Sequence, residues 1–316
     1  MPQLVSVQKI WDYSENNALA DLIYFKNQFF CSIRESDEHA GGRDGEIRIL
    51  SSPDAKNWKA VAIISLRGTD LRDPMLSIMP NGKLLLTMGG SRYKKERCLG
   101  CNPCVAFSTN GTDWSDVAKL DYSNEWIWRV TWHKGTGYAI SYRNNPEDVD
   151  EPWVATLFQT KDAFNYDVIT ELNVAKNPSE GTIRFLPDNS MVALLRRQGP
   201  GMIGHSKPPY TKWKWTDIGF RVGGPNFLIL PNGDMWAGSR LLAEEKMRRT
   251  TLAKMSSKTY EPVLVLPSGG DTSYPGLVYR DGHMYMCYYS SHEDKTNVYL
   301  ATIKLDSKMA DESDSR

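Results

Sequence analysis

The chain has 316 residues, 41% hydrophobic and 11% aromatic, and its 38 basic and 38 acidic side chains give a formal net charge of zero. This balance provides no basic surface for nucleic acid, and no apolar run approaches the roughly 18 residues that a membrane span needs. The N-terminus lacks the features of a secretory signal, and five cysteines are an odd number, so we expect a cytoplasmic protein, or a secreted one if a signal has been removed.

Short strands separated by Asn-Gly or Asp-Gly turns recur along the whole chain. One turn motif punctuates them: Ser or Thr, then Asp or Asn two residues later, then an aromatic residue. Its copies are Ser52–Trp58, Ser108–Trp114 and Thr160–Tyr166, with degenerate copies at Ser206–Trp213 and Ser256–Tyr260. The Asp or Asn side chain can bond its own turn backbone, and the ring can fill the gap between neighbouring sheets. Copies about 50 residues apart have the spacing of propeller blades.

These turns divide residues 1–305 into six units of four strands, which predicts an all-β fold, a single six-bladed β-propeller of antiparallel blades. The sixth unit has only three strands, whereas an extra strand, Leu4–Trp11, precedes the first unit. We expect this N-terminal strand to close the ring as the outer strand of the last blade. Residues 306–316 are polar, and we expect a disordered tail. The inner strands are expected to begin near Leu19, Arg72, Trp126, Glu180, Gly224 and Ser273.

A tyrosine, Tyr274, stands at the start of the last inner strand, and the hairpin that follows turns at Asp281-Gly282. Several arginines also fall near strand ends that a propeller brings to one rim. A planar guanidinium matches a carboxylate through paired donors, so these side chains together predict a site for an anionic ligand. The arginines are Arg34, Arg72, Arg196, Arg197 and Arg240.

The turn motifs on a six-bladed pattern resemble the Asp boxes, or BNR repeats, of the sialidase (neuraminidase) superfamily. The segment from Ser179 to Arg196 is similar to that family's glutamate, strand, turn, strand, arginine unit, and Ser273-Tyr274 is similar to its tyrosine-containing start of the last blade. The resemblance implies that Tyr274 is a nucleophile, that Glu180 deprotonates it, and that Arg196 grips a substrate carboxylate.

The run from Arg34 to Ala40 is similar to the Asp-Glu-His-Ala run of animal cytosolic sialidases. The resemblance implies that Asp37 is the acid/base, and His39 can tune it. Arg249 resembles the last arginine of the family's triad, with Arg248 and Arg240 as alternatives.

The first triad arginine is missing, because Ala18 stands where the family has the arginine of an Arg-Ile-Pro motif. Arg34 or Arg72 could substitute for it at the same rim. Otherwise the substrate is an acidic sugar other than sialic acid.

The resemblance implies an exo-glycosidase that hydrolyses a terminal acidic sugar of a glycan, with retention and without a cofactor. A neutral phenol suits such a substrate, because a carboxylate nucleophile would be repelled by the sugar's own carboxylate, and a neighbouring base must activate the phenol. Two other functions stay open. One is a polysaccharide lyase that acts on a uronic acid through Tyr274 and His39 or His292. The other is a non-catalytic propeller that binds glycan or protein.

Three cysteines, Cys98, Cys101 and Cys104, are separated by two residues each, but a fourth ligand for a metal is missing, and Cys31 and Cys287 fall in predicted strands. We therefore expect no metal here, and a loop with exposed thiols.

Overall fold

The computed structural model describes residues 1–95, 97–143, 147–148, 150–242 and 248–305. The predicted tail, 306–316, lies outside these residues. The regular structure of the described residues is made of β-strands, and none of these residues forms a helix that could cross a membrane.

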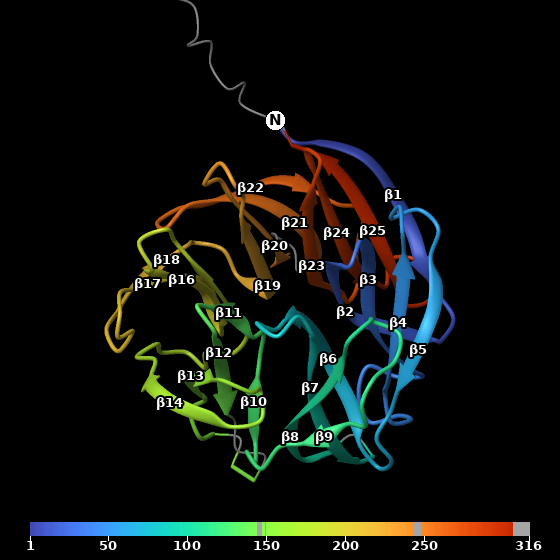
Figure 1. The fold of residues 1–316 in the computed structure, drawn as a ribbon, viewed down its shortest axis with the longest axis horizontal. Coiled ribbons are helices and arrows are strands. Elements are labelled where there is room, and N and C mark those ends of the chain that lie inside the picture. Colours follow the sequence, from blue (N-terminus) through green and yellow to red (C-terminus); the bar gives the residue numbers. More distant parts are fainter. Residues whose placement is uncertain (96, 144–146, 149, 243–247, 306–316) are drawn as a thin grey trace, which may run out of the picture.

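Six antiparallel sheets, numbered as blades 1 to 6 in chain order, surround a central channel (Figure 1). The first three blades have the following strands. Blade 1 contains β2 (Asn16–Phe25), β3 (Gln28–Ser36), β4 (Glu46–Ser52) and β5 (Lys59–Ile64); blade 2 contains β6 (Asp70–Ile78), β7 (Leu84–Lys94), β8 (Arg97–Ser108) and β9 (Ala118–Lys119); blade 3 contains β10 (Glu125–Ile127), β11 (Thr131–His133), β12 (Thr136–Arg143), β13 (Val154–Thr160) and β14 (Tyr166–Glu171).

The other three blades follow the same inner-to-outer order. Blade 4 contains β15 (Gly181–Phe185), β16 (Met191–Arg197), β17 (Gly199–Ser206) and β18 (Trp213–Asp217); blade 5 contains β19 (Val222–Ile229), β20 (Met235–Leu242), β21 (Arg248–Met255) and β22 (Tyr260–Val265); blade 6 contains β23 (Thr272–Arg280), β24 (His283–Ser290), β25 (Asn297–Lys304) and β1 (Gln3–Trp11).

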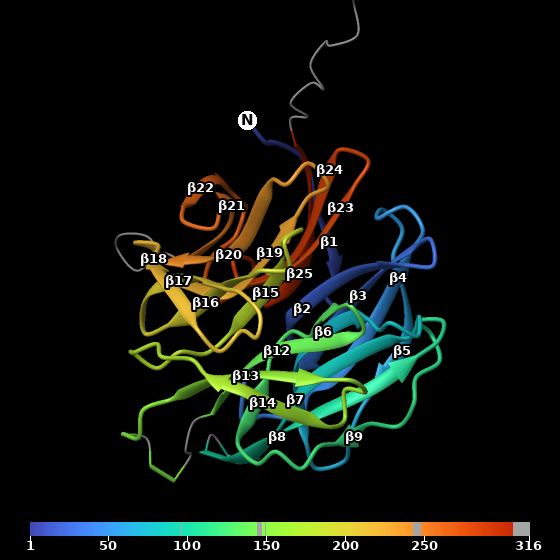
Figure 2. The same ribbon diagram turned by 60° about the vertical axis from the view of Figure 1, so that its left-hand side comes forward.

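The six-bladed fold and its closure are confirmed. The N-terminal strand β1 pairs antiparallel with β25 as the outer strand of blade 6, with Gln3 opposite Lys304 (Figures 1 and 2). Blade 3 differs from the expected four strands, because its innermost strand is split into β10 and β11, which both pair with β12. Trp128 lies in the gap, and its buried ring packs edge-to-face against Tyr274.

Hydrophobic side chains fill the spaces between neighbouring blades. The second strands read as continuous apolar runs because both of their faces are covered: Met191–Leu195 of β16 is buried throughout. The predicted turn motif forms as expected, since Asp54 Oδ1 accepts hydrogen bonds from the Lys56 and Asn57 amides, both at 2.9 Å. Trp58 then packs against the core shared by blades 1 and 6.

Four of the six innermost strands carry a β-bulge at the same level of the channel, in β2, β6, β19 and β23. Each bulge holds one residue in the left-handed region, and these are Leu19 (φ 55°), Asp73 (φ 50°), Gly224 (φ 58°) and Tyr274 (φ 54°). This conformation is strained for residues other than glycine, and such strain concentrates at functional sites. The bulges therefore mark the level at which a site is expected.

Candidate active site

Tyr274, Glu180 and Arg196 meet at this level, although Tyr274 comes from blade 6 and the other two from blade 4. The Tyr274 hydroxyl donates to Glu180 Oε1 at 2.6 Å. Arg196 Nη1 donates to the same oxygen at 2.5 Å and lies 3.5 Å from the Tyr274 hydroxyl. Glu180 is only 3% exposed, whereas Tyr274 is partly exposed. The three groups that the sequence singled out thus form one hydrogen-bonded cluster.

Gly224, which sequence reasoning missed, makes this cluster possible. Its amide donates to Glu180 Oε2 at 2.7 Å, which fixes the second carboxylate oxygen. A Cβ added to Gly224 would lie 2.9 Å from both Cα and Cγ of Tyr274, so only glycine allows the tyrosine to approach so closely. Gly224 and Tyr274 are each followed by a proline in the sequence, and both are bulge residues. This shared pattern is the signal by which Gly224 could have been predicted from the sequence.

The electrostatics of the cluster keep Tyr274 neutral in the resting state. Burial, followed by the nearby negative charges of Glu180 and Asp73, raises the Tyr274 pKa well above its usual value, although Arg196 opposes the rise. Glu180 in turn raises the pKa of Arg196. A phenol in this setting becomes a nucleophile only if Glu180 accepts its proton during the reaction.

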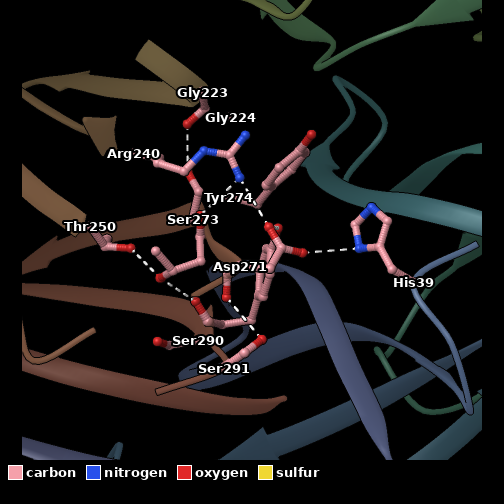
Figure 3. Close-up of polar contacts among 12 residues, drawn as sticks. His39, Gly223, Gly224, Arg240, Thr250, Asp271, Ser273, Tyr274, Ser290 and Ser291 are labelled. Atoms are coloured by element: carbon pink, nitrogen blue, oxygen red, sulfur yellow. Dashed lines mark hydrogen bonds and ion pairs between the residues drawn. The ribbon is translucent and has the colours of Figure 1, made fainter. Parts of the chain in front are cut away.

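Asp271 forms a second centre beside the tyrosine (Figure 3). Its carboxylate accepts from Arg240 Nη1 at 3.0 Å and from the Tyr289 hydroxyl at 3.1 Å. The His39 Nδ1 lies 3.1 Å from Asp271 Oδ2. Although burial raises the Asp271 pKa, the interactions with His39 and Arg240 lower it overall. Asp271, which opens the run noted in the sequence, therefore orients two of the predicted ligand-binding residues.

A pocket of about 250 Å³ lies over both centres, and its walls carry an excess of basic groups. An adjoining hollow shares three of its arginines and adds Arg221 and Leu242. Within the described residues, no carboxylate forms an ion pair with Arg221 or Arg248. The pocket therefore suits an anionic ligand. Its lining residues are His39, Arg196, Arg240, Arg248, Asp271, Tyr274 and Tyr289.

Arg34 and Arg72, the expected substitutes for the missing arginine, do not line this pocket. Arg34 is 0% exposed and donates to both carboxylate oxygens of Asp70, at 2.8 and 3.0 Å. Arg72 donates to Asp70 at 3.2 Å and to the His39 carbonyl oxygen. Both guanidinium groups thus share the Asp70 carboxylate inside the protein, and the charge of Asp73 acts on both as well. Ala18 is also buried, and it directly precedes the bulge residue Leu19.

Asp37 and Asp73 are the two aspartates that bear on acid/base chemistry. Asp37 is exposed on the loop after β3, and the Arg43 amide donates to it at 2.7 Å, which lowers its pKa. Asp73, which sequence reasoning missed, is 7% exposed, and its Oδ1 has no hydrogen-bond partner in the described part of the chain. Burial raises the pKa of Asp73 to about 7, with Glu180 adding to the rise and Arg72 opposing it.

The remaining arginine and histidine candidates lie outside the pocket. In β21, Arg248 and Thr250 are on the face that Arg240 shares, whereas Arg249 points to the opposite face, and its Nη1 donates to the Arg248 carbonyl. Arg197 binds Asp217 at 2.7 Å. His292 Nδ1 lies 2.9 Å from the Ser290 hydroxyl.

The expectation of a loop with exposed thiols at the cysteine run was wrong. Residues Arg97–Ser108 form the strand β8, and Cys101 and Cys104 are buried. No group of metal-ligating side chains occurs among the described residues.

In sequence, the chain matches no protein-family model and no curated protein. A protein of unknown function from Dyadobacter fermentans DSM 18053 has a similar structure, with a TM-score of 0.84 and 16% identity over 96% of this chain and 99% of that chain. Trypanosoma rangeli sialidase, in complex with 2,3-difluorosialic acid as a covalent intermediate, matches with a TM-score of 0.70 and 11% identity over 96% of this chain.

The chain therefore shares the propeller fold of this sialidase. The chain spans 57% of the length of that sialidase. A mutant of an α-L-arabinofuranosidase from Fusarium graminearum, in complex with an iminosugar inhibitor, matches with a TM-score of 0.73 and 15% identity over 95% of this chain and 98% of that chain. At these identities the likeness establishes the fold, and the site must carry any argument about function.

Proposed function

We propose that the protein is a retaining glycoside hydrolase that removes a terminal acidic sugar, with Tyr274 as the nucleophile. The hydrogen bond of 2.6 Å between the Tyr274 hydroxyl and Glu180 is the observation that carries the proposal. The neighbouring arginine-lined pocket supplies the site for the sugar's carboxylate. The turns at Ser52, Ser108 and Thr160 are then Asp boxes of the sialidase type.

In the first step, Tyr274 Oη forms a bond to the anomeric carbon while the bond to the leaving-group oxygen breaks. The phenol proton passes to Glu180, and an acid protonates the leaving group. In the second step, water attacks the anomeric carbon, and the base that deprotonates it is the former acid. Glu180 returns its proton to the departing Tyr274 oxygen.

Two aspartates are candidates for the acid/base. The sequence resemblance favours Asp37, on the loop that also carries His39. The physical chemistry favours Asp73, because a carboxyl group whose pKa is raised to about 7 can hold and release a proton near neutral pH. Replacement of the true acid/base by Asn slows hydrolysis of poor leaving groups much more than that of aryl leaving groups, which need little protonation.

In a second candidate function, two carboxylates carry out the reaction and the tyrosine is not the nucleophile. Glu180 and Asp73 interact electrostatically within the channel, and a structural neighbour of nearly equal length is an arabinofuranosidase. In this alternative Glu180 attacks a neutral sugar directly, Asp73 is the acid/base, and Tyr274 orients Glu180.

The test is hydrolysis of a panel of aryl glycosides by the wild type, Tyr274→Phe and Glu180→Gln. The panel contains the aryl glycosides of sialic acid, its deaminated analogue, the eight-carbon ulosonic acid, glucuronic acid and arabinofuranose. The proposal expects turnover of an acidic sugar, a loss of about 10³-fold or more in kcat for Tyr274→Phe, and about 10²–10⁴-fold for Glu180→Gln. Turnover of the arabinofuranoside with only a small loss in Tyr274→Phe would support the two-carboxylate alternative.

Two further outcomes would support the other functions that the sequence left open, the polysaccharide lyase and the non-catalytic binding propeller. A product that absorbs near 235 nm would identify a lyase. Binding without turnover, unchanged in Tyr274→Phe, would identify a non-catalytic propeller.

A further inference from the structure

The central channel has a second mouth, at the far ends of the innermost strands. A pocket of about 240 Å³ lies there, and all six blades contribute to it through their innermost strands. These residues follow the level of Tyr274 by three or four positions, which corresponds to about 10–13 Å along a strand. One from each blade is Leu22, Leu76, Thr131, Arg184, Leu228 and Leu277.

Tightly packed backbone separates the two mouths. Asn226 Nδ2 donates to the Pro275 carbonyl at 2.9 Å, which links blades 5 and 6 across this layer. A Cβ added to Gly276 would lie only 2.1 Å from the Leu22 nitrogen, so blades 6 and 1 are in close contact as well. The second pocket shares no lining residue with the pocket over Tyr274. It is therefore a separate site.

Arg129 in this second pocket is buried with one of its donors unused. It is 7% exposed, and its Nη1 donates to Asp21 Oδ2 at 2.6 Å. Its Nη2 lies 3.1 Å from the Met75 sulfur, a weak acceptor. Its Nε has no hydrogen-bond partner among the described residues. Asp21 thus neutralises the charge of Arg129, but the Nε donor of this arginine stays without a hydrogen bond.

Arg184, next to it, is bonded only to neutral oxygens. Its Nη1 donates to Thr131 Oγ1 at 3.1 Å and to the Ile183 carbonyl at 2.8 Å, and its Nη2 donates to Asn226 Oδ1 at 3.1 Å. In the described part of the chain, no carboxylate forms an ion pair with it. Two guanidinium groups therefore line the pocket, and among the described residues the carboxylate that pairs with them is that of the fully buried Asp21, bonded to Arg129.

The excess positive charge of the two neighbouring guanidinium groups is energetically unfavourable. Burial and the neighbouring Arg129 lower the pKa of Arg184 to about 9. A buried charge without a counter-charge is costly, and one added negative group would offset that cost.

We propose that this second mouth binds a small organic carboxylate through Arg184, with Arg129 contributing its free Nε donor. The side chains that line the pocket favour an organic anion over an inorganic one. Apart from the charged groups, they consist mainly of aliphatic side chains, with the indole of Trp132 beside them. An apolar pocket with a few convergent polar groups fits a ligand that has an apolar body and one charged end. A hydrated inorganic ion would leave these walls uncovered.

The test measures binding of benzoate and butyrate to the full chain by ligand-detected NMR and calorimetry. Matched probes are the neutral amides, benzamide and butyramide, and sodium chloride. Arg184→Gln removes the unpaired charge, whereas Arg67→Gln removes an exposed arginine that lines neither pocket and serves as its matched control. Crystals of the wild type soaked in 4-bromobenzoate locate the carboxylate directly through the anomalous signal of bromine.

We expect both carboxylates to bind, the amides and chloride to bind at least about tenfold more weakly, and Arg184→Gln to lose about tenfold or more in affinity. Arg67→Gln should bind as the wild type does, and the bromine should lie beside Arg184. Equal binding by Arg184→Gln and wild type would overturn the proposal. So would equal binding of acid and amide, tighter binding of chloride, or bromine only beside Arg196, Arg240 and Arg248. If Arg184→Gln does not fold, the bromine position in the wild type decides.

Discussion

Two sides of the same rim use arginine in opposite ways. On the side of blades 1 and 2, Arg34 and Arg72 both bind Asp70, and the three groups are at most 7% exposed. On the side of blades 4 and 5, Arg196 and Arg240 also touch acids, but they line an open pocket. Because the arginines of both sides bind acids, the comparison teaches that exposure to the pocket, and not the absence of an acidic partner, distinguishes the two sides.

The largest effect on this comparison is expected from Asp70→Asn. Loss of this carboxylate leaves two buried guanidinium groups without their counter-charge, which should lower the free energy of unfolding by about 3–5 kcal/mol. Urea unfolding monitored by tryptophan fluorescence measures the change. The matched control is Glu46→Gln, which breaks an exposed pair with Arg43 and should cost less than about 1 kcal/mol. If both variants lost a similar free energy of unfolding, Asp70 would not act as a buried counter-charge, and the proposed difference between the two sides of the rim would be wrong.

Asp73 is the exception on the blade 2 side, because its pKa is raised from 3.8 to about 7. The folded protein keeps this proton where the unfolded chain releases it, so stability from this group is present below about pH 4 and is lost as pH rises through 7. Asp73→Asn should therefore stabilise the protein at pH 8, by about 2–4 kcal/mol, and hardly at pH 4.

Thermal unfolding at the two pH values measures the Asp73 effect. Asp37→Asn is the matched control, since the pKa of that exposed aspartate is lowered and its removal should give no gain at pH 8. A stability gain of Asp73→Asn that does not depend on pH would contradict the assignment of the raised pKa.

The smallest effect is expected from Arg248→Gln, which tests whether this arginine binds substrate on the side of blades 4 and 5. Arg248 lines the pocket from the first position of β21 and is exposed, so its loss should raise KM for an acidic substrate about tenfold, with little change in kcat or stability. Arg249→Gln is the matched control on the opposite face and should leave KM unchanged. Steady-state kinetics decides, and equal effects of both variants would remove Arg248 from the binding surface.

The sequence by itself determined the fold and the centre of the candidate site. Turn motifs and strand periods are local, so one pass along the chain was enough to predict six blades and ring closure by the N-terminal strand. Tyr274 and Glu180 could be predicted to lie together because each stands at the start of the innermost strand of its own repeat. Arg196 could be added because it lies near the end of the second strand of the repeat that Glu180 opens. A repeat fixes a residue's height along the channel.

Only the tertiary structure decided which charged groups line the candidate pocket. Asp70 neutralises Arg34 and Arg72 across blades, the face of β21 selects Arg248 over Arg249, and the packing around Asp73 raises its pKa. These outcomes depend on partners far apart in sequence and on the depth of burial, neither of which a repeat pattern encodes. A repeat sets the position of each side chain in its blade, whereas its charge and partners follow from the neighbouring blades.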